Sequence, residues 1–278
     1  YHSAANDMIK VNALSAICEK MVHEDWKKYQ TFQLVLIEKA LETNPPTEEN
    51  LSLKKALAGA LNNIGIIYDN KGDPLSALAH YERGLKVYEE IGNKKGVANI
   101  YNNIGTIHNE LGNIDLAFDY HTKSLHIQEE TGNKKGIAFS YHNLALILSE
   151  QGSFALALEY YGKSLNIHEE IGDKRAMAIT YNGIGVIYRN QDNIELAVVY
   201  YNKSLKIAME MGDKRGMALS YTNIGTSYKY TGDIPLALAN YEKSLKINKE
   251  IGNKKGTAMT SNYIAQIALK KGELTGPE

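Results

Sequence analysis

Histidine and serine are the side chains in this 278-residue chain that could perform acid-base or nucleophilic chemistry, and neither stands at a catalytic spacing. His121 and His126 are five residues apart, so they point in different directions on a helix. The segment "HNEL", which begins at His108, is not the His-Glu-x-x-His pattern that binds zinc. Serines without a neighbouring histidine and aspartate recur at Ser124, Ser164, Ser204 and Ser244. We therefore predict no enzyme, no metal site and no cofactor.

Basic pairs are the second candidate for chemistry, because five turns carry the sequences GNKKG, GNKKG, GDKRA, GDKRG and GNKKG in phase. A stripe of such pairs could bind the phosphates of a nucleic acid. Each pair, however, follows acidic residues of the preceding segment, for example Glu89 and Glu90 before Lys94 and Lys95. We expect these charges to pair with one another across the turn as a solvated structural edge, which leaves nucleic-acid binding as a less favoured alternative.

The composition is that of a water-soluble globular protein. The chain has 31 basic and 32 acidic side chains, so no overall field favours nucleic acid or an anionic membrane as a partner. A single cysteine, Cys18, excludes an internal disulfide framework. No apolar run approaches the roughly 20 residues of a membrane helix, and no signal-peptide pattern opens the chain. We expect no membrane contact within this segment and a cytoplasmic location, or a periplasmic one if the chain, which begins at Tyr1, is a fragment of a sensor.

A repeat of 40 residues organises the elements that carry these side chains. One glycine series recurs at Gly92, Gly132, Gly172, Gly212 and Gly252, and a second divides each unit at Gly72, Gly112, Gly152, Gly232 and Gly272, with Asp192 as its one substitution. Apolar residues of the first segment fall at helical spacing, as in Ile100, Ile104, Ile107 and Leu111. Glycine stops each helix, and the residue after it, such as Asn113, Asp233 or Asp73, can cap the next. Each unit is predicted to be a helical hairpin.

Asparagines form a polar face on the first helix of each unit. Asn is a mediocre helix former, so the adjacent pair Asn102 and Asn103 needs a reason beyond helix formation. Tyrosine, alanine and isoleucine positions supply the two faces that packing requires. The residues left over are Asn99, Asn102, Asn103, Thr106, Asn109 and Glu110. A primary amide offers donors and an acceptor together, which suits it to the backbone of an extended peptide.

The unit resembles the tetratricopeptide repeat. "YNGIGVIYRN" and "IELAVVYYNKSL" match its signature through Tyr181, Ile184, Gly185 and Tyr188 in the first helix and through Ala197 and Tyr201 in the second. The pattern covers residues about 52 to 271. Its length and its lack of a closing proline make it similar to the 40-residue variety found in animal spindle-orientation adaptors and in bacterial sensory and regulatory proteins.

The resemblance implies an all-α fold, a tetratricopeptide-type right-handed superhelical solenoid of helical hairpins. We expect one continuous solenoid, with a divergent hairpin over 1–50, five units and a final capping helix over 51–271, and a tail over 272–278. The family places the polar face of the first helix on the concave side and uses asparagine there for peptide binding. The predicted groove residues are Asn62, Asn63, Asn99, Asn102, Asn103, Asn109, His142, Asn143, Asn182, Arg189, Asn223, Lys229 and Asn262. Hydrogen bonding between repeats that fixes the stacking angle is the alternative role of this ladder.

These observations favour a protein-protein interaction module that binds a peptide or protein segment in its groove. By resemblance, it is the sensory or scaffolding part of a larger regulatory protein, and its partner is another protein or its own output domain. The alternatives are a self-assembling scaffold that stacks end to end, a nucleic-acid-binding solenoid and a tetratricopeptide-type response-regulator phosphatase. The groove is also expected to be polarised, with acid near the ends of the first helices in the early units and base at Arg189 and Lys229.

Overall fold

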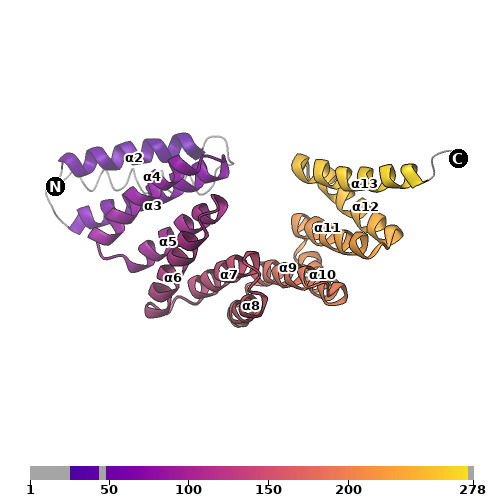
Figure 1. Cartoon of the computed structure of the whole chain (residues 1–278). Helices are drawn as coiled ribbons and strands as arrows, with labels where there is room; N and C mark the ends of the chain where they lie inside the picture. Colours follow the sequence, from indigo (N-terminus) through magenta and orange to yellow (C-terminus); the bar gives the residue numbers. More distant parts are fainter. Residues whose placement is uncertain (1–25, 44–47, 275–278) are drawn as a thin grey trace. The chain divides into compact units, whose positions relative to one another are not determined.

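The computed structural model describes residues 26–43 and 48–274, and within these ranges the secondary structure consists of helices joined by short turns. The helices are α2 (Trp26–Thr43), α3 (Glu48–Asn70), α4 (Pro74–Glu90), α5 (Lys94–Glu110), α6 (Ile114–Glu130), α7 (Lys134–Glu150), α8 (Phe154–Glu170), α9 (Lys174–Asn190), α10 (Ile194–Met211), α11 (Lys214–Thr231), α12 (Ile234–Glu250) and α13 (Lys254–Leu274). Consecutive helices pair as hairpins, such as α3 with α4 and α11 with α12 (Figure 1). The all-α repeat fold predicted from the sequence is thereby confirmed.

The chain divides into two compact units, with the boundary inside α7 between Ile147 and Leu148, and each unit is described by itself. Unit 1 contains α2 to α6 and most of α7, and unit 2 contains the end of α7 and α8 to α13. A helical hairpin was predicted over residues 1–50, and α2 lies in the second half of that range. Residues 1–25, which include Cys18, lie outside the described residues. At the other end α13 continues through Gly272, where a stop was expected, because Glu273 rather than a capping Asn or Asp follows it.

Glycines and caps delimit the helices as their spacing predicts. The glycines that follow the helices have φ between 64° and 83°, a left-handed conformation that costs glycine no side-chain clash. Asp73 and Asp233 cap α4 and α12, since their carboxylates accept hydrogen bonds from backbone N–H groups of the first turn at 3.1 Å. Asn113 does not cap α6, contrary to expectation, because its amide lies 3.4 Å from His108 Nδ1 instead.

In the hairpins α3–α4, α5–α6, α9–α10 and α11–α12, a ring from the second helix packs onto a glycine of the first. Tyr201 and Tyr241 are buried, and a Cβ added at Gly185 would lie 2.5 Å from Tyr201 Cε1, so only glycine allows this approach. His121 takes the same place in unit 1. The tyrosines are therefore core, as predicted from the repeat. Leu111 is exposed although its spacing suggested packing, because it lies just past the end of α5.

The repeating serines are buried contacts between helices. Ser124 Oγ donates a hydrogen bond to the carbonyl of Ala98, and Ser244 Oγ donates to the carbonyl of Ala218, both at 2.8 Å. A small side chain at this position lets the two helices of a hairpin approach closely, and the backbone satisfies the hydroxyls of Ser124 and Ser244. The serine series therefore has a packing role, with all four side chains buried.

Candidate functional site

The first helix of each hairpin carries all the predicted groove residues. Asn62 and Asn63 lie on α3, and α5 carries Asn99, Asn102, Asn103 and Asn109. The remaining ones are His142 and Asn143 on α7, Asn182 and Arg189 on α9, Asn223 and Lys229 on α11, and Asn262 on α13. Their environments differ, because some amides are buried between helices and others face solvent.

In unit 1 the asparagine pair of α5 holds neighbouring hairpins together. Asn102 is only 3% exposed, and its Nδ2 donates to Ser140 Oγ at 3.2 Å while its Oδ1 lies 3.0 Å from His121 Nδ1. Asn103 is half-buried and donates to Asn62 Oδ1 of the preceding hairpin at 2.8 Å. The first amide of the pair therefore belongs to the core, and the second reaches back to the hairpin before it.

Unit 2 repeats this arrangement in the same register. Asn182 is 8% exposed and donates to Ser204 Oγ at 2.6 Å. Its Oδ1 accepts a hydrogen bond from Asn223 Nδ2 at 3.3 Å, so α9 and α11 are joined as α3 and α5 are. In α11 a threonine replaces the buried asparagine, and Thr222 Oγ1 lies 2.7 Å from Ser244 Oγ. The ladder thus fixes the stacking of repeats within each unit.

The other predicted amides have looser environments. Asn99 and Asn262 are exposed, and Asn99 Oδ1 accepts a bond from Gln128 Nε2 at 3.3 Å. Asn143 Nδ2 lies 3.5 Å from His121 Nδ1. The Oδ1 atom of Asn109 is buried and has no hydrogen-bond partner among the described residues. Asn99 and Asn262, which are exposed, keep hydrogen-bonding capacity that a ligand could use.

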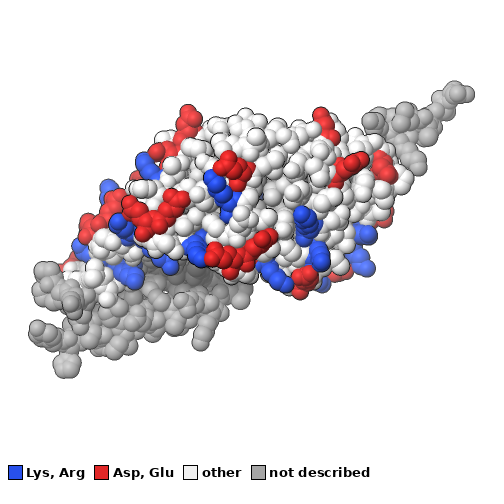
Figure 2. All heavy atoms as spheres, turned by 90° about the horizontal axis from the view of Figure 1, so that it is seen from below, with Lys and Arg blue, Asp and Glu red and all other residues white. Residues whose placement is uncertain are grey.

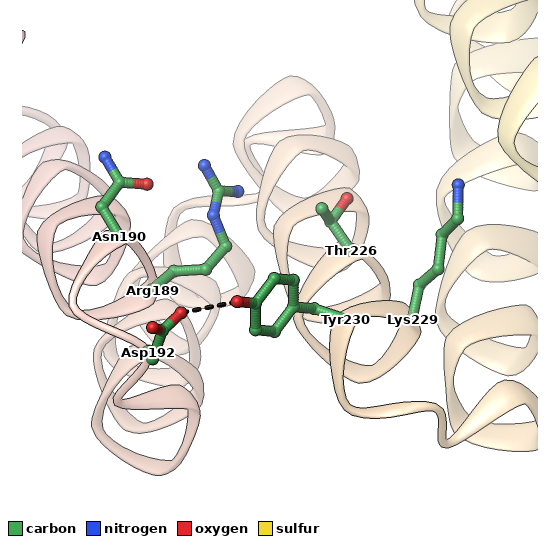
Figure 3. A pocket seen from close by; sticks show the side chains of 6 residues that line it. All are labelled: Arg189, Asn190, Asp192, Thr226, Lys229 and Tyr230. Atoms are coloured by element: carbon green, nitrogen blue, oxygen red, sulfur yellow. Dashed lines mark hydrogen bonds between the residues drawn. The ribbon is translucent and has the colours of Figure 1, made fainter.

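Arg189 and Lys229, predicted together as the basic end of the groove, line one cleft of unit 2. The cleft has a volume of about 530 Å³ and is lined by Arg189, Asn190, Asp192, Thr226, Lys229 and Tyr230. The arginine and lysine side chains extend in the same direction from α9 and α11 (Figure 3). No carboxylate among the described residues forms an ion pair with Arg189, and Lys229 Nζ donates to the neutral Oε1 of Gln266 at 2.9 Å. The cleft can therefore accept an anionic group.

Asp192 shapes the rim of this cleft. It is the one described non-glycine residue with a positive φ, 61°. The equivalent position in the other repeats is a glycine, such as Gly152 or Gly232. Its carboxylate accepts a hydrogen bond from the Tyr230 hydroxyl at 2.6 Å, and this bond raises the pKa of Tyr230 (Figure 3). In unit 1 the corresponding helix ends are acidic: burial, with the charge of Asp69, raises the pKa of Glu110.

An apolar series on the same helices was missed by the sequence analysis. Ile179, Leu219 and Met259 are 53%, 48% and 41% exposed on α9, α11 and α13 of unit 2. Successive members of this series are 40 residues apart, and Phe139 of unit 1 is in phase with them. On α5 the equivalent position is Asn99. The signal was therefore present in the repeat, but the polar face was defined from α5 alone, where this position is an asparagine.

The basic turns are engaged in ion pairs between repeats. Lys94 pairs with Glu130, and Lys54 pairs with Glu90, both at 2.9 Å. In unit 2 the corresponding pair is Lys174 with Glu210 at 3.1 Å. The sequence predicted that each basic pair forms ion pairs with the acidic residues across its own turn, and this was wrong. Stacking of the hairpins instead places a glutamate 36 residues later in the chain next to the lysine. Basic and acidic side chains are interspersed on the face shown in Figure 2, so that face presents no basic stripe for phosphates.

Metal clusters and membrane helices are both lacking in the described part of the chain. No group of three or more His, Cys, Asp or Glu side chains there could hold a metal ion. Within the same ranges, no helix combines the length and apolar character needed to cross a membrane.

The tetratricopeptide repeat family accounts for the repeat, the packing rings and the stacked hairpins together. A sequence model of this family matches residues 56–130 and 136–210, and a second one matches residues 218–251. The chain belongs to the tetratricopeptide repeat family, as its resemblance predicted. No curated protein matches the chain.

Several solved structures have the same fold. BtubC from P. vanneervenii is 20% identical with a TM-score of 0.67, and the match covers 84% of this chain and 93% of that one. A Rap conjugation gene regulator of the plasmid pLS20, in complex with the Phr* peptide, is 13% identical with a TM-score of 0.65 over 90% and 77% of the two chains. The STAND protein PH0952 from Pyrococcus horikoshii, which has a tetratricopeptide repeat sensor, is 19% identical with a TM-score of 0.62 over 94% of this chain and 42% of that one.

Proposed function

We propose that this chain is a protein-interaction module that binds a peptide or protein segment along the first helices of its hairpins, and that it performs no catalysis. The half-buried amides at the second position of this ladder, Asn103 and Asn223, carry this proposal. Asn103 and Asn223 are half-buried, and each donates one hydrogen bond to an amide of the preceding hairpin. A primary amide has two donor hydrogens and an acceptor oxygen, so capacity remains for a peptide group.

The hydrogen bond to the preceding hairpin also fixes the orientation of the second amide. A side chain that is already held in place loses less conformational entropy when a ligand binds, so more of the interaction free energy contributes to affinity. The similarity to the Rap regulator that is solved with the Phr* peptide supports this type of ligand. The similarity to a STAND protein with a tetratricopeptide repeat sensor supports a sensory role within a larger regulatory protein.

Selection from a random peptide library tests the proposed function, because the selection itself finds a ligand. Peptides enriched on the full chain would be measured by fluorescence anisotropy against the wild type, against Asn103→Ala with Asn143→Ala, and against the control Asn113→Ala. We expect the double variant to bind roughly 5- to 100-fold more weakly, or about 1 to 3 kcal/mol, because a peptide group loses its partner. The control, which changes an exposed amide in a turn, should bind as the wild type does.

The double substitution should leave the fold intact, since Asn103 loses only one half-buried hydrogen bond, worth about 1 kcal/mol. A urea titration would check this. The proposal would be wrong if no peptide were enriched, or if the enriched peptides bound the double variant as tightly as the wild type.

A further inference from the structure

We propose that unit 2 binds an amphipathic helical segment across α9, α11 and α13, with an apolar edge on Ile179, Leu219 and Met259 and an acidic edge on Arg189 and Lys229. This inference names the ligand class of the binding face and so rests on the proposed function. It is carried by two features of unit 2, an exposed apolar row and a cleft with two cations.

The apolar row lies on neighbouring helices. The three side chains are 53%, 48% and 41% exposed and occupy the same position of successive first helices. Side-chain hydrogen bonds join these helices: Asn223 to Asn182 between α9 and α11, and Lys229 to Gln266 between α11 and α13. A continuous row of large exposed apolar side chains is uncommon on a surface that faces only water, and it is typical of a binding surface.

The basic edge differs from the lysines that begin α9 and α11. Lys174 and Lys214 form ion pairs with glutamates of the next repeat at 3.1 and 3.2 Å. Arg189 has no such partner within residues 148–274, and Lys229 interacts with the neutral Gln266 and, at 5.8 Å, with the ring of Tyr263. With the carboxylate of Asp192 engaged by Tyr230, the cleft retains a net positive charge that complements an acidic ligand.

The apolar row and the cleft lie on one side of these helices. Ile179, Gly183, Val186 and Asn190 are spaced at i, i+4, i+7 and i+11 on α9, and Asn190 lines the cleft. On α11 the same positions begin at Leu219 and end at Tyr230, which also lines the cleft. A ligand that lies across these helices can therefore touch both edges.

The separation of the two edges favours a helix as the ligand. Ile179 and Arg189 are ten residues apart on α9, which is about 15 Å at the helical rise of about 1.5 Å per residue. A bound α-helix is about 10 to 12 Å wide with its side chains, so its opposite flanks can reach both edges at once. At the midpoint Gly183 adds no side chain of its own, and the ring of Tyr161 packs onto it, since a Cβ there would lie 2.7 Å from that ring.

A designed probe tests the inference. The probe is a fluorescent amphipathic peptide of about 18 residues, long enough to form a helix, with Leu along one flank and Glu along the other. Its controls are a scrambled peptide of the same composition and a peptide in which Lys replaces each Glu. We expect the full chain to bind the Glu probe at least roughly tenfold more tightly than either control at low ionic strength.

Variants of the chain assign the two edges. Arg189→Glu with Lys229→Glu should weaken the Glu probe roughly tenfold or more, and the loss should shrink as salt shortens the screening length toward about 8 Å. Its control is Lys206→Glu with Lys246→Glu, the same charge change on the exposed surface of α10 and α12. Ile179→Asn with Leu219→Asn, which introduces the residue that α5 carries at Asn99, should also weaken the probe, whereas Val199→Asn on α10 should not.

The inference would be overturned if the probe bound no better than its scrambled control or if the Arg189 and Lys229 variant bound it unchanged. It would also be overturned by a single-stranded oligonucleotide that bound more tightly than the probe and was lost in the same variant. Each of these three outcomes would leave the proposed function testable. Peptides selected from the random library would still bind along the first helices and depend on Asn103 and Asn143. Absence of any selected peptide would instead remove the proposed function itself.

Discussion

His121 makes the stability of unit 1 depend on pH between about 4 and 6.5. The imidazole is 1% exposed, packs on Gly105 and lies 3.0 Å from the Oδ1 of Asn102. Burial lowers the pKa of His121 from 6.5 to about 4, because desolvation disfavours the charged form. As pH falls below 6.5, the unfolded state binds a proton that the folded state does not bind. Folding stability is therefore full above pH 6.5 and decreases until the folded imidazole is itself protonated near pH 4.

The size of the effect follows from the two pKa values. With 6.5 for the unfolded and about 4 for the folded state, linkage gives a loss of about 2 kcal/mol between pH 7 and pH 5. The full loss, reached below pH 4, is about 3 kcal/mol at about 1.4 kcal/mol for each tenfold difference. A change of this size is a large fraction of the stability of a typical domain.

Hydrogen exchange at the amides of α5 and α6 measures this change locally, which suits an array whose repeats can open separately. The variant His121→Tyr introduces the ring that unit 2 has at Tyr201 and Tyr241 and removes the titrating group. Comparison with the wild type at each pH cancels the intrinsic pH dependence of exchange and the titration of carboxylates. The control is His126→Asn, a change at an exposed histidine of the same helix. Equal pH dependence in wild type and His121→Tyr would refute the reasoning.

Three further substitutions test the packing and the cleft, each through the free energy of unfolding in urea. Gly185→Ala should cost about 1 to 3 kcal/mol, since its Cβ would lie 2.5 Å from Tyr201, whereas Gly162→Ala, with nothing within 4 Å, should be neutral or stabilising by up to about 1 kcal/mol. Asn102→Ala should cost about 1 to 3 kcal/mol because it leaves buried polar partners unpaired. Asp192→Gly should stabilise by up to about 1 kcal/mol because it relieves a positive φ of 61°.

The repeat period predicted the fold because each structural need recurs at the same place in every unit. The glycine with positive φ after a helix was predicted from the repeat, and Gly212 fulfils that expectation. The glycine under a ring, as at Gly185, recurs in phase but was recognised only in the structure. Five copies in phase therefore determine the hairpins and their core even where long-range contacts are not known. The exception at Asn113 shows the limit of this reasoning, since a capping residue can take a competing local partner.

The site was harder to predict because it depends on rotation about a helix axis and on stacking. Asn102 and Asn103 differ by one residue, which is about 100° around the helix, and that rotation places one in the core and the other at its edge. The partner of Glu90 is Lys54 of the preceding repeat rather than a lysine across the turn, because stacking brings the two together. Sequence proximity alone does not reveal such neighbours.

Asp192 combines a strained backbone conformation with a contact at the cleft. A non-glycine residue in the left-handed region costs about 1 to 2 kcal/mol, and the exposed bond to Tyr230 contributes about 0.5 to 1.5 kcal/mol, which is of similar size. Glycine at the equivalent Gly232 ends its helix without this strain. The bond does fix the ring of Tyr230 at the rim of the cleft that also holds Arg189 and Lys229. A rigid rim limits where an acidic side chain of the ligand proposed above can enter.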